Sequence, residues 1–135
     1  MTDRDGTTMN AHHAFNPITA APRDSRMFVQ QTLASWGIPE LADIAGLLTS
    51  ELVTNVVCHA ATAIEVDVTW SKPILRVEVR DRSFVSPAVR GTTGPEGGYG
   101  LRIVAALAQN WGVPERADGK DVWFTMERSL DQLAK

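Results

Sequence analysis

Two neighbouring segments with alternating apolar residues constrain the fold more than any other feature of this sequence. The first covers residues 63–70 and the second residues 74–81, and only Ser71, Lys72 and Pro73 separate them. The apolar positions are Ile64, Val66, Val68, Trp70, Leu75, Val77 and Val79. Alternation puts the apolar side chains of a strand on one face, so the pair predicts an antiparallel hairpin with one buried face. A sheet of this kind needs a second layer that covers its apolar face.

Segments with helical periodicity on both sides of the hairpin can supply this second layer. Residues 22–36 carry apolar residues at helical spacing and stop before Gly37. Pro39 opens a second helix, which we expect to reach about Ala60. A third helix is expected over residues 101–111.

The remaining segments predict two further strands and one long loop. Residues 11–18 fit a short edge strand closed by Pro17, and residues 121–128 alternate like a final strand. Residues 82–100 hold five glycines and two prolines, follow no periodicity and predict a functional loop. The order of elements predicts an α/β two-layer sandwich, in which helices cover one face of a mostly antiparallel sheet.

Length and composition indicate one globular domain. The chain has 135 residues, of which 44% are hydrophobic and 21% charged, so it can bury one sizeable core. We expect residues 1–11 to form a flexible polar tail and residues 12–135 to form the domain. The formal net charge of −3 argues against nucleic acid or an anionic membrane as a general partner. With a single cysteine, Cys58, the chain cannot form an internal disulfide, and we expect Cys58 to be a small buried residue. The polar start of the chain predicts a cytoplasmic protein.

A line of polar residues on the second predicted helix is the first candidate for a functional site. Glu51, Asn55 and His59 recur every four residues, which places them in one stripe on a helix. A solvated helix face explains most stripes of this kind. However, helix propensity does not favour an asparagine at position 55, and His59 could simply favour the negative end of the helix dipole.

Two further clusters are a strand-terminal acid and a glycine turn. Asp81 ends the strand 74–81, where it either caps a turn or accepts a hydrogen bond from an exocyclic amine of a buried ligand base. Gly97, Gly98 and Gly100 directly precede the third predicted helix. Glycines and a helix N-terminus let backbone amides approach an anion, although the lysine and hydroxyl residue of the common phosphate-binding loop are missing.

Taken together, the three clusters resemble the ATP-binding domain shared by gyrases, heat-shock chaperones and histidine kinases, often called the Bergerat fold. ELVTNVVCHA, residues 51–60, is similar to its asparagine box. VEVRDRS, residues 77–83, is similar to the first glycine box, and GGYGLRIV, residues 97–104, to the second. The resemblance runs from about Pro22 to Met126. A stand-alone domain of this size with these motifs is most similar to the bacterial anti-sigma-factor serine/threonine kinases.

The resemblance implies a magnesium–nucleotide site, with ATP and Mg²⁺ as cofactors. Asn55 would give its amide oxygen to the Mg²⁺, and Glu51 would be the general base that takes a proton from the attacking hydroxyl group. Asp81 would accept a hydrogen bond from the adenine amino group. His59 would have a supporting role.

The glycine boxes would contact the rest of the nucleotide. Gly98 and Gly100, together with the amide of Leu101, would lie against the triphosphate, and Ser83 would offer its hydroxyl group near the base. Ser83 and Val85 stand where many relatives have two glycines.

Three charged residues near these boxes are weaker candidates. Arg90 and Arg102 lie beside the glycine loop and could contact phosphates, although a solvated arginine is the more common interpretation of each. Asp121 stands near the place where relatives often have a threonine beside the adenine.

The resemblance also implies partners and an activity. The protein would phosphorylate an anti-sigma-factor antagonist protein and, in another state, sequester a sigma factor, with no direct contact to nucleic acid or membrane. Homodimers are common among similar proteins. The alternative that the altered first glycine box favours is a nucleotide-gated binding module with little transferase activity. Two other functions are less favoured. A coupled ATPase of the topoisomerase or mismatch-repair kind needs further domains, and a histidine autokinase needs a helical hairpin that presents the phosphoacceptor, and we expect neither feature from this sequence.

Overall fold

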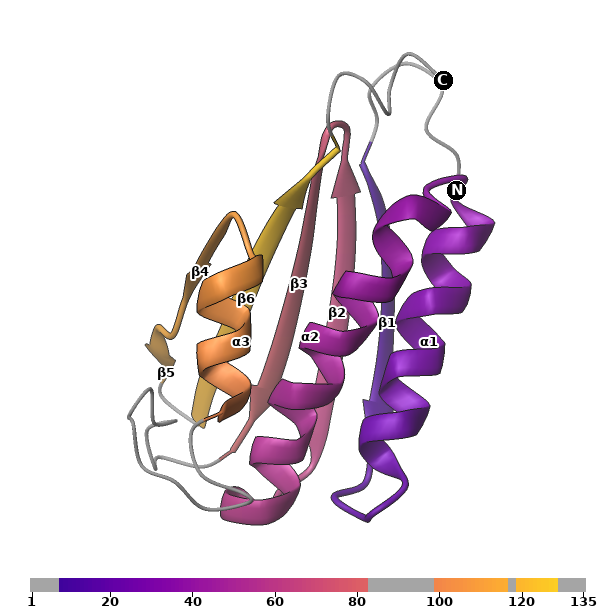
Figure 1. Cartoon of the computed structure of the whole chain (residues 1–135). Helices are drawn as coiled ribbons and strands as arrows, with labels where there is room; N and C mark the ends of the chain where they lie inside the picture. The colour runs from indigo at the N-terminus through magenta and orange to yellow at the C-terminus, as the bar shows by residue number, and fades with distance from the viewer. Residues whose placement is uncertain (1–7, 83–98, 117–118, 129–135) are drawn as a thin grey trace.

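Helices cover one face of an antiparallel sheet in this protein (Figure 1). The structure is a computed structural model and describes residues 8–82, 99–116 and 119–128. Within these residues the sheet has six strands in the order β1-β2-β3-β6-β4, with β5 paired to β6, and every pair is antiparallel. The predicted fold class, an α/β two-layer sandwich of the Bergerat type, is therefore confirmed. The elements are β1 Met9–Phe15, α1 Ala21–Ser35, η1 Pro39–Leu41, α2 Ala42–Asn55, η2 Val56–Ala60, β2 Ile64–Ser71, β3 Ile74–Asp81, α3 Tyr99–Leu107, β4 Asn110–Gly112, β5 Glu115–Arg116 and β6 Gly119–Glu127.

Strand β1 begins earlier than the sequence predicts. Met9 pairs with Trp70, and both side chains are buried. The predicted flexible tail, residues 1–11, is therefore wrong for residues 9–11, because an apolar side chain at position 9 completes the buried face of the sheet. Residues 1–7 lie outside the described part of the chain.

The hairpin β2–β3 has the predicted alternation. Its burial pattern alternates along both strands, and Trp70 pairs with Leu75, the second pair from the turn. Strand β6 pairs with β3 on the other side and adds Val122 and Phe124 to the same buried face.

The helix predicted from Pro39 to Ala60 consists of three parts. A 3₁₀ turn from Pro39 to Leu41 leads into α2, and the last five residues, Val56–Ala60, form the π-helical turn η2. The amide of Ala61 donates to the carbonyl oxygen of Val56 at 2.7 Å, which is an i→i+5 bond, and Ala61 has a φ of 55°. The chain thus leaves the regular helix after Asn55.

The helix predicted for residues 101–111 starts and ends earlier in the structure. Helix α3 runs from Tyr99 to Leu107, and β4 begins at Asn110. The amide of Gln109 already donates to the carbonyl oxygen of Thr125 on β6, at 2.8 Å. Strands as short as β4 and β5 are too brief for an alternation pattern, so the sequence did not predict them.

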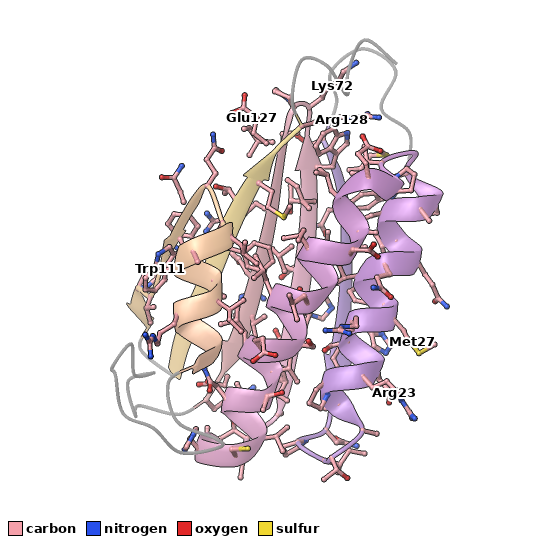
Figure 2. The ribbon with its side chains drawn as sticks, viewed as in Figure 1. Arg23, Met27, Lys72, Trp111, Glu127 and Arg128 are labelled. Atoms are coloured by element: carbon pink, nitrogen blue, oxygen red, sulfur yellow. The ribbon has the colours of Figure 1, made fainter. Side chains whose placement is uncertain are left out.

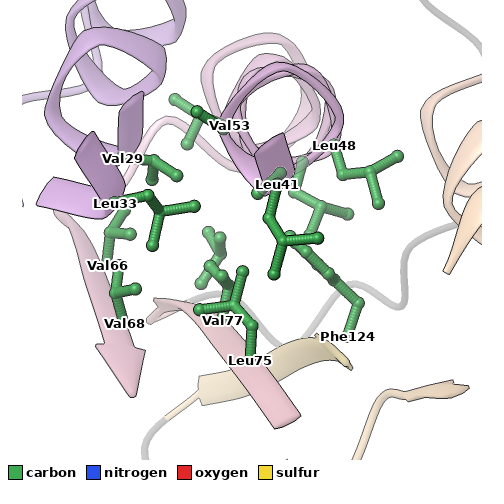
Figure 3. Close-up of a cluster of buried hydrophobic side chains, with 14 of the residues drawn as sticks. Val29, Leu33, Leu41, Leu48, Val53, Val66, Val68, Leu75, Val77 and Phe124 are labelled. Atoms are coloured by element: carbon green, nitrogen blue, oxygen red, sulfur yellow. The ribbon is translucent and has the colours of Figure 1, made fainter. Parts of the chain in front are cut away.

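The core lies between the sheet and helices α1 and α2 (Figure 3). Its fully buried side chains include Val29, Leu33, Leu48, Val53, Val66, Val68, Leu75, Val77 and Phe124. Burying one such side chain contributes about 1.5–3 kcal/mol, so this layer contact is the main stabilising interaction of the fold. One described helical stretch, Pro39–Ala60, is long and apolar enough to cross a membrane by length and composition, and its apolar residues form part of this core.

The end of β6 is fastened to the β2–β3 turn and to the start of the second helix. The amide of Arg128 donates to the carbonyl oxygen of Pro73 at 2.9 Å, and the Arg128 guanidinium pairs with Glu40. Arg128, Glu127 and Lys72 lie together at this end of the molecule, the upper end in Figure 2.

The face of the sheet that points away from the helices carries a charged network around Arg80. Its guanidinium contacts Glu65 at 3.3 Å, Glu78 at 3.1 Å and Asp121 at 3.4 Å, and it also pairs with Asp67. Burial alone would lower the pKa of Arg80, but hydrogen bonds to Asp67 and Glu78 and the charges of Asp67 and Asp121 raise it above the ordinary value. Loss of the Arg80 charge, and of the stability that this charge adds, would begin only as the pH rises toward this raised pKa, so the Arg80 charge is constant in the neutral range.

Replacing Arg80 by glutamine should lower the free energy of unfolding by about 1–2 kcal/mol, because half-buried carboxylates lose their shared cation. Urea denaturation measures the change. The matched control is Arg23→Gln on α1, whose side chain is 75% exposed and projects from the helix in Figure 2, and this change should have no measurable effect. Equal stability of the Arg80 variant and the wild type would contradict a stabilising network.

Candidate functional site

Four segments from distant parts of the sequence meet at one end of the molecule. They are the C-terminal part of α2 with η2, the end of β3, the first turn of α3 and the start of β6, at the lower end in Figure 1. Helix α2 packs against both α3 and β3. The predicted asparagine box, the strand-terminal acid and the start of the helix after the glycine turn therefore share one end of the fold.

Glu51 and Asn55 lie one turn apart on α2 and are both half-buried. Within the part of the chain that the structure describes, neither side chain has a hydrogen-bond or ion-pair partner. The hydroxyl groups nearby are satisfied by the helix itself, since Thr49 donates to the carbonyl oxygen of Ala45 and Thr54 to that of Ser50. The acid and the amide thus contribute no hydrogen bond or ion pair to the described part of the fold and are available to a ligand.

His59 lies outside the regular part of the helix. Residues 56–60 form a π-helical turn, whereas Glu51 and Asn55 lie on α2. His59 is exposed there, and Glu51 and Asn55 are half-buried. Cys58, expected to be buried, is also exposed.

Asp81 is a buried acid at the end of β3. Its exposed fraction is 6%, and among the described residues it is the one carboxylate in the buried set. A carboxylate costs several kcal/mol to bury unless donors compensate, and packing alone would favour an aliphatic residue. Asp81 has an interaction partner in the structure, and a carboxylate has further acceptor sites that a ligand with a donor can use.

The main chain around Asp81 is held by two residues that the sequence did not single out. The hydroxyl oxygen of Thr62 accepts a hydrogen bond from the amide of Arg82 at 3.1 Å. Gly119, with a φ of 148°, lies directly against the carbonyl group of Asp81. The one signal in the sequence was the glycine before the last alternating segment, and a single glycine occurs in many loops.

The first turn of α3 supplies backbone amides. The helix begins at Tyr99, so Gly100 and Leu101 lie in the turn whose N–H groups have no partner within the helix. Amides in this position favour an anion, and no acidic residue occupies the turn. Arg102 is exposed and has an interaction partner. Ser83, Val85, Arg90 and Gly98 lie outside the described residues, so their expected contacts remain predictions.

Asp121 lies on the opposite face of the sheet from Asp81. It pairs with Arg80 across β3 and β6, and its carboxylate is 3.4 Å from the Arg80 guanidinium. Since side chains alternate along a strand, Asp121 is directed away from the buried face on which Asp81 lies. It is not a contact of a base beside Asp81.

The donor set around Asn55 fits a cation held mainly by its ligand. Among the described residues, no group of three or more histidine, cysteine, aspartate or glutamate residues could hold a metal ion. Mg²⁺ commonly keeps one or two protein ligands and takes the rest from phosphate oxygens and water, and an amide oxygen is a suitable ligand. The residues therefore fit a magnesium–phosphate group better than a resident metal ion.

Comparisons with known proteins agree with this arrangement. The family model of the histidine kinase-like ATPase domain matches residues 17–126. The fold is similar, with a TM-score of 0.67 and 21% sequence identity, to the solved RsbU and RsbW domains of Rv1364c from Mycobacterium tuberculosis. That match covers 88% of this chain and 32% of the solved chain, so this chain spans about a third of its length. No curated protein matches the sequence.

Because Glu51 and Asn55 make no side-chain hydrogen bond or ion pair among the described residues, replacing either by alanine should leave the free energy of unfolding within about 0.5 kcal/mol of the wild type. By contrast, Leu52→Ala on the same helix should lower it by about 2–4 kcal/mol, because Leu52 is 2% exposed. Thermal and urea unfolding measure all three. A loss near that of Leu52→Ala in either polar variant would show a structural role instead.

Proposed function

Since the chain belongs to the histidine kinase-like ATPase family, we propose that it binds ATP at the end of the molecule where α2, β3 and α3 converge. The observation that carries the proposal is the pair Glu51 and Asn55, half-buried and without a described partner, at the same end as the buried acid Asp81. Two half-buried polar side chains without a described hydrogen-bond or ion-pair partner and one buried acid thus occur at the same end of the molecule. A nucleotide with an amino-bearing base and a triphosphate uses all three.

Each group has a role that its chemistry allows. Asp81 accepts a hydrogen bond from the adenine amino group, and the amides of the first turn of α3, with Gly98 and Gly100, contact the phosphates. Asn55 offers its amide oxygen to the Mg²⁺, which neutralises phosphate charge when bound. Ser83 adds a hydroxyl group near the base.

The proposed reaction is phosphoryl transfer from ATP to a serine or threonine of a protein. Glu51 lies one turn before Asn55, so its carboxylate takes the proton of an attacking hydroxyl group near the phosphates. A domain that only bound nucleotide would not need an acid at this position. The motifs resemble those of anti-sigma-factor kinases, so the proposed substrate is an anti-sigma-factor antagonist, and the proposed second partner is a sigma factor.

The location, the class of partner and the oligomeric state are proposed from composition and resemblance. The net charge of −3 does not favour nucleic acid or an anionic membrane as a direct partner. We therefore propose a cytoplasmic protein, and a homodimer by analogy with similar kinases.

A second candidate function is a nucleotide-gated binding module. It is favoured by Ser83 and Val85, which stand where many relatives have glycines that let the chain approach the nucleotide. Such a module would bind its protein partner in one nucleotide state and transfer little phosphate.

Glu51→Ala should reduce phosphate transfer by at least about a hundredfold and leave ATP affinity nearly unchanged, because a general base acts on the nucleophile and not on the nucleotide. Labelled ATP and a panel of purified antagonist proteins provide the assay. The control is Asp43→Ala, an exposed acid at the opposite end of α2, which should retain full transfer. Tight ATP binding by the wild type without transfer to any panel member would favour the binding module.

Asp81→Asn should weaken ATP binding by about 10–100-fold, since the charged acceptor is replaced by an amide that can turn a donor toward the adenine amine. Isothermal titration with and without Mg²⁺ measures the affinity. The exposed Asp24→Asn on α1 is the control and should bind ATP as the wild type does. An unaltered affinity in the Asp81 variant would rule out the base contact.

A further inference from the structure

Two residues from different parts of the chain hold the main chain at the end of β3. Thr62 lies in the link between η2 and β2, and Gly119 opens β6. Both contact the peptide groups of Asp81 and Arg82, and neither belongs to the motifs that the sequence analysis identified. Their shared position makes them candidates for a role in placing the Asp81 side chain.

Both hydrogen-bonding functions of the Thr62 hydroxyl group are used. Its oxygen accepts from the amide of Arg82 at 3.1 Å, and its proton is donated to the carbonyl oxygen of Ala63 at 3.2 Å. A hydroxyl group with both a donor and an acceptor contact has a fixed orientation. The residue after Asp81 is therefore tied to the segment that follows the asparagine-bearing helix.

Gly119 closes the other side of the Asp81 peptide. A Cβ on Gly119 would overlap the carbonyl oxygen of Asp81 and would lie 2.7 Å from the Cα of Arg82. The φ of 148° is also one that residues with side chains rarely adopt. Only a residue without a side chain lets β6 approach the end of β3 this closely, so any other residue must displace one of the two strands.

Thr62 and Gly119 together form a clamp on the last residue of β3, Asp81. The preceding pairs of β3 and β6, from Ile74–Glu127 to Arg80–Asp121, keep the strand register by their own hydrogen bonds. Asp81 pairs with Lys120, beyond which β3 ends. Changes at Thr62 or Gly119 should therefore move the Asp81 end of β3 and leave the rest of the sheet in place.

We propose that Thr62 and Gly119 are positioning residues that hold the Asp81 carboxylate where it selects a purine with an exocyclic amine. The proposal rests on the proposed function, in which Asp81 accepts a hydrogen bond from the adenine amino group. Asp81 is 6% exposed, so its carboxylate has little room to reorient, and small displacements of its main chain are transmitted to the base contact. Selectivity for the base, and not general stability, is the property that the clamp controls.

The experiment compares the affinities for ATP and for inosine triphosphate, in which an oxygen replaces the amino group at the same ring position. The full-length variants are Thr62→Val, which removes the hydroxyl group, Thr62→Ser, which keeps it, and Gly119→Ala. Gly37→Ala is the matched control for a positive-φ glycine. Gly37 has a φ of 80°, and a Cβ there would meet no atom within 4 Å. Thermal unfolding is recorded for every variant.

The wild type should prefer ATP over inosine triphosphate. Thr62→Val should reduce this preference by about fivefold, the effect of one hydrogen bond, and Gly119→Ala should reduce it by about tenfold or more. Thr62→Ser and Gly37→Ala should keep the wild-type preference, even where the unfolding temperature of Gly37→Ala falls.

Three outcomes would overturn the proposal in distinguishable ways. A wild type that binds neither nucleotide would refute the proposed function and the clamp with it. A wild type that prefers ATP while Thr62→Val and Gly119→Ala keep that preference would refute the clamp alone. Equal losses of affinity for both nucleotides, together with a lower unfolding temperature, would show that the two residues act on stability and not on base selection.

Discussion

The burial of one apolar sheet face under the helices is the interaction on which the rest of the structure depends. The buried side chains of β2, β3 and β6 meet those of α1 and α2, and Val104 of α3 joins the same core. Because this contact places the helices along the strands, it also determines which ends of the helices and strands lie next to one another. The end of β3, the end of α2 and the start of α3 thereby come to one place, and the candidate site is a consequence of the packing.

The polar residues of the site differ from the other polar residues of the core in what they contact. Thr49 and Ser50 on α2 are buried, and their hydroxyl groups donate to carbonyl oxygens of the same helix. Glu51 and Asn55, on the same helix, have no such partner among the described residues. Helix α2 thus carries two kinds of polar group, one satisfied by the fold and one without a described hydrogen-bond or ion-pair partner. This contrast is what the proposed nucleotide site rests on.

The sequence was informative where a pattern is local and repeats. The alternation in β2 and β3 predicted the hairpin, and Asp81 was recognisable because an acid ended an apolar strand. Short elements have too few residues to form a pattern, so β4 and β5 were missed, and β1 was recognised only in part because a single apolar residue, Met9, extends it. The roles of Thr62 and Gly119 depend on contacts across long sequence separations, which no local pattern contains.

The π-helical turn after Asn55 has a consequence for how this chain is compared with others. An i→i+5 bond accommodates one more residue per turn than a regular helix, so η2 takes up an extra residue without moving α2 or β2. The number of residues between Asn55 and the next strand is therefore not fixed by the geometry of the sheet. An alignment that assumes regular helical spacing through this segment would equate His59 with the wrong residue of a relative that lacks the turn, although Glu51 and Asn55 would still be matched correctly.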